Sequence, residues 1–105
     1  MKNIELQISE AFRKILFTPH ALYYLNSPNR LILRKEVEEV TNKRDIIENY
    51  PEDARGHSSL MMARVTTEQV IHIVCAPKQE YLAVISTYLP NLDKWEVDLK
   101  IRKRG

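Results

Sequence analysis

The sequence LMMARVTTEQVIHIVCAPKQEYLAVISTYL, residues 60–89, holds three apolar runs separated by two short polar connectors. We predict strands at residues 60–66, 70–76 and 81–89, because short runs rich in Val, Ile, Thr and Tyr are typical of strands. The connectors TEQ and PKQE are too short for a parallel crossover, so neighbouring strands are expected to pair antiparallel. This part of the chain should form a β-meander.

The first half of the chain carries helical patterns. A helix is expected to run to about residue 13, followed by the short apolar stretch ILF, because these apolar residues recur at helical spacing: Ile4, Ile8, Ala11, Phe12 and Ile15. Thr18 as N-cap and Pro19 at the first helical position predict a second, short helix that carries His20 in its first turn. Pro28 interrupts the pattern. A third helix is expected from about Leu31, with its glutamates outward and these residues inward: Leu33, Val37 and Val40.

After Asp45 the sequence pattern changes from helical to strand-like. The sequence DIIENYPED indicates a short strand that ends in a turn at Pro51. Helices in the first half and strands in the second predict an α+β fold, with N-terminal helices packed on one face of a small antiparallel sheet. At 105 residues the chain fits a single domain, residues 1–105.

The charges of the chain are unevenly distributed. The formal net charge is only +2, which is too small to identify a nucleic-acid-binding protein by overall charge. Residues 36–53 are rich in Asp and Glu, whereas residues 97–105 form a short basic tail with Lys100, Arg102, Lys103 and Arg104. Two interpretations of this tail stay open: a contact with phosphate, or a solvated and frayed end.

Several classes of protein are not indicated by the sequence. The lone Cys75 has no partner for an internal disulfide and is expected to be buried. No apolar run is long enough to span a membrane and the N-terminus lacks the apolar core of a signal peptide, so we expect a cytoplasmic protein. The histidines lack the spacing of a metal site, and the chain has no glycine-rich phosphate loop. We therefore expect neither a metal nor a cofactor.

Polar residues within apolar strands are the main candidates for function. His72 shares one side of its predicted strand with Val70 and Val74, while the other side is apolar. In the last strand the alternation predicts that one side carries Leu82, Val84, Ser86 and Tyr88. The other side is then formed by Tyr81, Ala83, Ile85 and Thr87. This pattern suits a sheet with one covered face and one working face.

Histidine with arginine or lysine is the minimum set for metal-free RNA cleavage, because imidazole transfers protons near neutral pH and the cations hold phosphate. The candidates are His20, His72, Tyr88, Arg30, Arg34, Arg64 and Arg102. The histidines of the chain also have structural interpretations. His72 fits a half-buried strand, His20 fits packing or capping of its helix, and His57 fits a solvated loop.

Ordered motifs along the chain resemble a protein family. The segments TPHALYYL, VIHIVCA and LAVISTYLPNLDKW resemble the bacterial and archaeal family called domain of unknown function 4258, over about residues 16–96. The positions that match its pattern are His20, Ala21, Tyr50, Pro51, Leu60, His72, Thr87, Tyr88, Pro90 and Trp95. The chain departs from the pattern at Tyr23 and Tyr24, which replace a basic residue and a Met, so that Arg30 is left to stand in for the helix arginine.

The resemblance implies a fold and an activity. The family is similar to the RelE/ParE toxin superfamily, whose fold is a small antiparallel sheet with helices packed against it. Members of that superfamily include ribonucleases held inactive by an antitoxin and others that act on gyrase. The resemblance implies a metal-independent endoribonuclease with RNA or the ribosome and an antitoxin as partners, and no membrane association. His72 and His20 would share proton transfer and Tyr88 would orient the substrate, while phosphate would be bound by Arg30, Arg64 and Arg102.

The sequence leaves two alternatives to an endoribonuclease open. The first is a non-catalytic module that binds a protein or nucleic acid through the same sheet face and the basic tail. The second is a gyrase poison.

Overall fold

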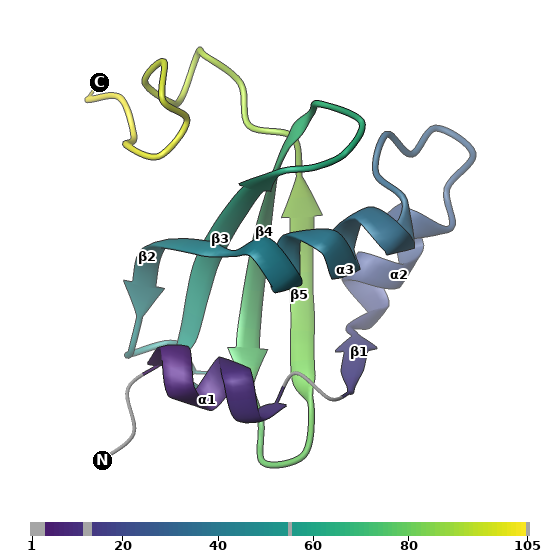
Figure 1. Ribbon diagram of the computed structural model, residues 1–105, viewed down its shortest axis with the longest axis vertical. Helices are drawn as coiled ribbons and strands as arrows, with labels where there is room; N and C mark the ends of the chain where they lie inside the picture. The colour runs from purple at the N-terminus through teal and green to yellow at the C-terminus, as the bar shows by residue number, and fades with distance from the viewer. Residues whose placement is uncertain (1–3, 12–13, 55, 105) are drawn as a thin grey trace.

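The computed structural model describes residues 4–11, 14–54 and 56–104. Its elements, in chain order, are α1 (Ile4–Ala11), β1 (Ile15–Phe17), α2 (Pro19–Leu25), α3 (Arg34–Lys43), β2 (Asp45–Tyr50), β3 (Ser58–Arg64), β4 (Val70–Pro77) and β5 (Leu82–Tyr88). Within this part of the chain, the strands form one five-stranded sheet in the order β1-β5-β4-β3-β2, and the helices pack on one face of it (Figure 1). The predicted α+β class is confirmed.

The sheet is mixed rather than wholly antiparallel. The pairs β2/β3, β3/β4 and β4/β5 are antiparallel, which confirms the predicted meander. The edge strand β1, however, pairs parallel with β5, and its Ile15 lies opposite Leu82. The prediction of an antiparallel sheet is therefore wrong at this edge. The stretch ILF is too short to show a period of its own, and only its long-range contact with β5 makes it a strand.

One of the three predicted helices, α3, begins later than expected. Helix α2 begins as predicted, because the Thr18 hydroxyl oxygen accepts the N–H of Ala21 and Pro19 opens the helix. Helix α3 begins at Arg34 instead of near Leu31, and Leu33 is 39% exposed rather than inward. Helix α1 is described to Ala11, and the predicted continuation through Phe12 lies outside the described residues.

Glu36 corrects the prediction that the glutamates of α3 all face solvent. Its side chain is buried, with 4% of its surface exposed. Its carboxylate accepts hydrogen bonds from the Leu33 backbone N–H at 2.9 Å, the Thr67 hydroxyl at 2.7 Å and the Gln69 amide at 3.1 Å. A buried carboxylate needs such donors. Glu36 thus ties the β3–β4 turn to the beginning of α3.

The hydrophobic core lies between the helices and the sheet. Val37 and Val40 of α3 are fully buried there, as predicted, and so is Cys75 of β4. The remaining core members come from α1, α2, the three central strands and the loops before α3 and after β3: Ile8, Ala21, Leu25, Ile32, Met61, Ala63, Val65, Ile71, Ile73, Leu82 and Val84. This core fixes the positions of β4 and β5, which carry the candidate site on their other face.

The C-terminal segment, residues 91–104, folds back on the sheet. Within it, the Glu96 N–H donates to the Ile101 carbonyl at 2.8 Å and the Lys103 N–H to the Lys94 carbonyl at 2.9 Å. Lys100 pairs with Asp45 of β2 at 2.8 Å. The basic tail is therefore attached to the acidic part of the chain, and the frayed-end interpretation is wrong for the described residues. None of the described helices is long and apolar enough to cross a membrane.

Candidate functional site

His72 lies in β4 on the face of the sheet opposite the helices. Its strand neighbours Ile71 and Ile73 belong to the core on the helix side, and the alternation of the strand directs His72 the other way. There its side chain is completely buried. Buried polar groups require hydrogen-bond partners, so the neighbours of the imidazole decide its protonation state.

A β-bulge in β5 places Tyr88 beside His72. Val84 pairs with Cys75 and Tyr88 pairs with His72, so four steps along β5 match only three along β4. The extra residue turns Val84 to the core and Tyr88 to the opposite face. The prediction that one side of this strand carries four residues in alternation is therefore wrong for Leu82, Val84, Ser86 and Tyr88. The grouping of His72 with Tyr88 depends on this bulge.

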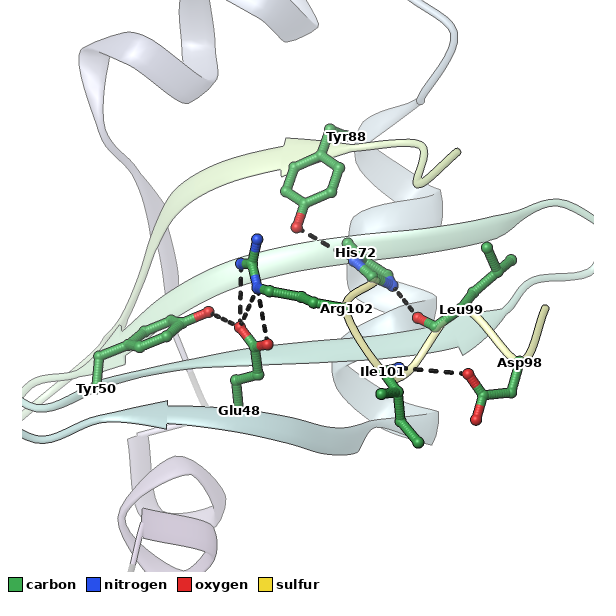
Figure 2. A network of polar contacts seen from close by, with 8 residues as sticks. All are labelled: Glu48, Tyr50, His72, Tyr88, Asp98, Leu99, Ile101 and Arg102. Carbon is green, nitrogen blue, oxygen red and sulfur yellow. Dashed lines mark hydrogen bonds and ion pairs between the residues drawn. The ribbon is translucent and has the colours of Figure 1, made fainter. Parts of the chain in front are cut away.

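Both ring nitrogens of His72 have partners. Nε2 lies 2.8 Å from the backbone carbonyl oxygen of Leu99, which can only accept, so Nε2 carries the proton. Nδ1 then accepts from the Tyr88 hydroxyl, 3.2 Å away. Trp95 covers the imidazole edge to face, with ring centroids 4.5 Å apart. Figure 2 shows the resulting chain of hydrogen bonds, which runs from Tyr88 through His72 to Leu99.

The environment keeps this pair neutral. Burial lowers the pKa of His72 below its ordinary value, and this outweighs the hydrogen bond to Leu99 and the charge of Glu48, which both raise it. Burial also raises the pKa of the Tyr88 phenol. The imidazole therefore remains a neutral acceptor and the phenol a neutral donor near pH 7.

Glu48 of β2 holds the C-terminal segment through Arg102. The Arg102 Nε lies 3.2 and 2.9 Å from the two carboxylate oxygens, and Nη2 lies 3.1 Å from Oε1 (Figure 2). The Tyr50 hydroxyl donates to the same carboxylate. Burial raises the pKa of Glu48, but the hydrogen bonds from Arg102 and Tyr50 outweigh it and the net shift is downward. Burial and the bond to Glu48 raise the pKa of Tyr50 to about 12.

An open cleft of about 440 Å³ lies where β5 ends. It is lined by residues 88–91 together with Lys94, Trp95 and Arg102. Arg102 is stacked over the Trp95 ring at 4.6 Å, which holds its guanidinium in place. The cleft is thus lined by Tyr88, by the exposed Lys94 and by Arg102, whose guanidinium also pairs with Glu48. This combination suits an anionic ligand such as a phosphate.

The structure gathers only part of the predicted site. His72, Tyr88 and Arg102 lie together, whereas His20 is exposed and lines a different cleft of about 400 Å³. Arg30 and Arg64 are also exposed, and neither lines the cleft at the end of β5. Arg30 donates to the Ser27 carbonyl, and Arg64 donates to the Glu68 carbonyl in the β3–β4 turn. The two histidines therefore do not share a cleft.

Four members of the site were missed by the sequence analysis: Glu48, Tyr50, Lys94 and Leu99. The alternation of DIIENY places Glu48 and Tyr50 on one side of their strand, which is a signal that could have identified them. Leu99 acts through its backbone carbonyl, so its side chain carries no signal. Among the residues described, no three His, Cys, Asp or Glu side chains are grouped so as to hold a metal ion.

The comparisons with known proteins identify the family. The sequence profile described as Domain of unknown function (DUF4258) matches residues 17–89, which is more than half of the chain. The chain belongs to the DUF4258 family. The matched region contains His72 and Tyr88 and ends at the cleft, so the C-terminal segment that covers His72 lies beyond it. No curated protein and no solved structure gives a significant match.

Proposed function

We propose that this DUF4258 protein is a RelE/ParE-like toxin of a toxin–antitoxin pair that cleaves RNA in the cleft at the end of β5. The observation that carries the proposal is the Tyr88 hydroxyl, which donates to a buried imidazole while Tyr88 lines a cleft with Lys94 and Arg102. A phenol backed by a proton acceptor and faced by cations provides the groups that metal-independent phosphodiester cleavage requires.

In the proposed reaction, the 2′-hydroxyl of the RNA attacks the adjacent phosphorus. Its proton passes to the Tyr88 oxygen as the Tyr88 proton moves to Nδ1 of His72. The imidazolium that forms is stabilised by the Leu99 carbonyl and by the charge of Glu48. Lys94 and Arg102 bind the phosphate, and the departing 5′-oxygen takes its proton from the ammonium of Lys94. Tyr88 is the catalytic residue, and His72 acts through it.

The test is cleavage of labelled messenger RNA in a cell-free translation reaction, with naked RNA and EDTA in parallel. We expect Tyr88→Phe to lower the cleavage rate by about 100-fold, in line with the loss of a general acid–base group. Tyr23→Phe is the matched control, because Tyr23 is 84% exposed on α2 and should leave the rate unchanged. Equal cleavage by Tyr88→Phe and the wild type would rule out this mechanism.

A second candidate function is a non-catalytic module that binds RNA in the same cleft. The complete burial of His72 and the pairing of Arg102 with Glu48 favour it, because both groups are already engaged within the protein. This candidate requires RNA affinity that falls steeply with salt, without cleavage in any reaction. Lys94→Gln should weaken such binding, whereas Lys103→Gln is the control for a lysine that does not line the cleft.

A further inference from the structure

Arg30 and Arg34 line a second basic hollow, away from the cleft at the end of β5. This pocket, of about 320 Å³, lies between the end of α2 and the beginning of α3, and it is lined by Leu25, Asn26, Arg30, Leu33 and Arg34. It shares no residue with the cleft that contains Tyr88. The function proposed above does not involve it.

Each arginine of the pocket has a described contact other than an ion pair. The Arg34 guanidinium stacks over the Phe17 ring, 4.9 Å from its centroid. An Nη1 of Arg30 donates to the Ser27 carbonyl at 3.1 Å. Among the described residues, neither forms an ion pair with Asp or Glu, whereas Arg102 is neutralised by Glu48. Within the described part of the chain, the two positive charges of the pocket are therefore not paired with a carboxylate.

These features fit a bound phosphate group. Arg30 and Arg34 both line this hollow, and an anion bound there would lower the repulsion between their like charges. Arginine presents paired N–H donors that match phosphate oxygens, and the polar residue Asn26 lines the same pocket. The volume is at the lower end of the range for small-ligand pockets. The contacts with Phe17 and Ser27 restrict both side chains before any ligand binds, which reduces the entropy lost on binding.

We propose that Arg30 and Arg34 form a phosphate-binding site. Its ligand is a phosphate group, either a phosphodiester within an RNA strand or a terminal phosphate monoester. The proposal does not depend on catalysis at Tyr88, because the two sites have no lining residue in common.

The experiment measures the fluorescence anisotropy of a 3′-labelled oligouridylate that carries either a 5′-hydroxyl or a 5′-phosphate, with inorganic pyrophosphate as competitor. We expect Arg30→Gln and Arg34→Gln each to weaken binding about tenfold, the value of one charge-assisted hydrogen bond. Lys35→Gln is the matched control, since it removes the same charge from the next residue of α3 without touching the pocket. It should change the affinity by less than about twofold.

The two RNA probes distinguish the source of the phosphate. Equal losses with both probes would assign the pocket to the RNA backbone, and a loss confined to the 5′-phosphorylated probe would assign it to a terminal phosphate. Arg34→Lys keeps the charge but loses the paired donors, and it replaces Arg34→Gln if that variant does not fold. It should weaken binding by less than the roughly tenfold factor expected for Arg34→Gln. The proposal is overturned if the wild type binds neither probe, if both arginine variants bind as the wild type does, or if Lys35→Gln causes an equal loss.

Discussion

The ion pair between Glu48 and Arg102 is expected to contribute measurably to stability, although one partner is exposed. Arg102 keeps 56% of its side-chain surface exposed and Glu48 keeps 22%, so solvent screens much of the attraction. Exposed ion pairs contribute about 0.2–1 kcal/mol, and the bidentate geometry places this pair near the upper limit. The stacking of Arg102 on Trp95 adds about 0.5–1 kcal/mol. We therefore expect Arg102→Met to lower the free energy of unfolding by about 1.5–2 kcal/mol.

A double-mutant cycle isolates the ion pair from the stacking contact. Urea denaturation of the wild type, Arg102→Met, Glu48→Gln and the double variant should give a coupling energy of about 1 kcal/mol. The ion pair is the interaction that both single substitutions remove, so it alone contributes to this coupling energy. The coupling should shrink in about 1 M salt, where the screening length is near 3 Å. A coupling below about 0.3 kcal/mol at low salt would show that the bidentate contact contributes nothing. Lys100→Gln, which removes a more exposed pair of the same segment, should have the smaller effect.

Four further results are expected. The pKa of His72 in the folded protein lies below its ordinary value of 6.5, so the unfolded chain takes up the proton first as the pH decreases. The free energy of unfolding should therefore fall as the pH decreases from 6.5. Urea denaturation of His72→Gln at the same pH values should not show this decrease. The lowered pKa of Glu48 adds a separate loss below its ordinary value of 4.5. Glu36→Gln should lower the free energy of unfolding by about 1–3 kcal/mol, because one carboxylate oxygen is replaced by an NH₂ group that cannot accept a hydrogen bond. An unchanged midpoint in thermal denaturation would contradict this. Cys75 should react with a thiol reagent only at the rate of unfolding, since it is completely buried, and fast labelling of the native protein would show otherwise.

Much of the architecture could be predicted from local patterns. The meander of β3, β4 and β5 follows from three apolar runs joined by short connectors, and the beginning of α2 follows from Thr18 and Pro19. These signals depend on neighbouring residues only. Strand β1 was missed because three residues show no period, and Glu36 was placed in solvent because its donors Thr67 and Gln69 are distant in the sequence.

The candidate site could be predicted in its chemistry but not in its assembly. His72 and Tyr88 stand out as polar residues in apolar strands, and Arg102 stands out in a basic tail. Their meeting depends on the bulge in β5 and on the return of the C-terminal segment, and neither follows from a residue pattern. Strict alternation placed Val84 and Tyr88 on the same side of their strand. One extra residue in the bulge reverses that relation.

The sequence by itself determined the fold class, the strands of the meander and the residue types available for chemistry, because hydrophobic periodicity and side-chain chemistry are properties of short segments. The tertiary structure alone decided which of these residues meet. It buried His72 behind the carbonyl of Leu99 and neutralised Arg102 with Glu48. The physical reason is that each of these contacts joins segments far apart in the chain or on separate elements, and their approach is set by the packing of the core and by the register of the sheet.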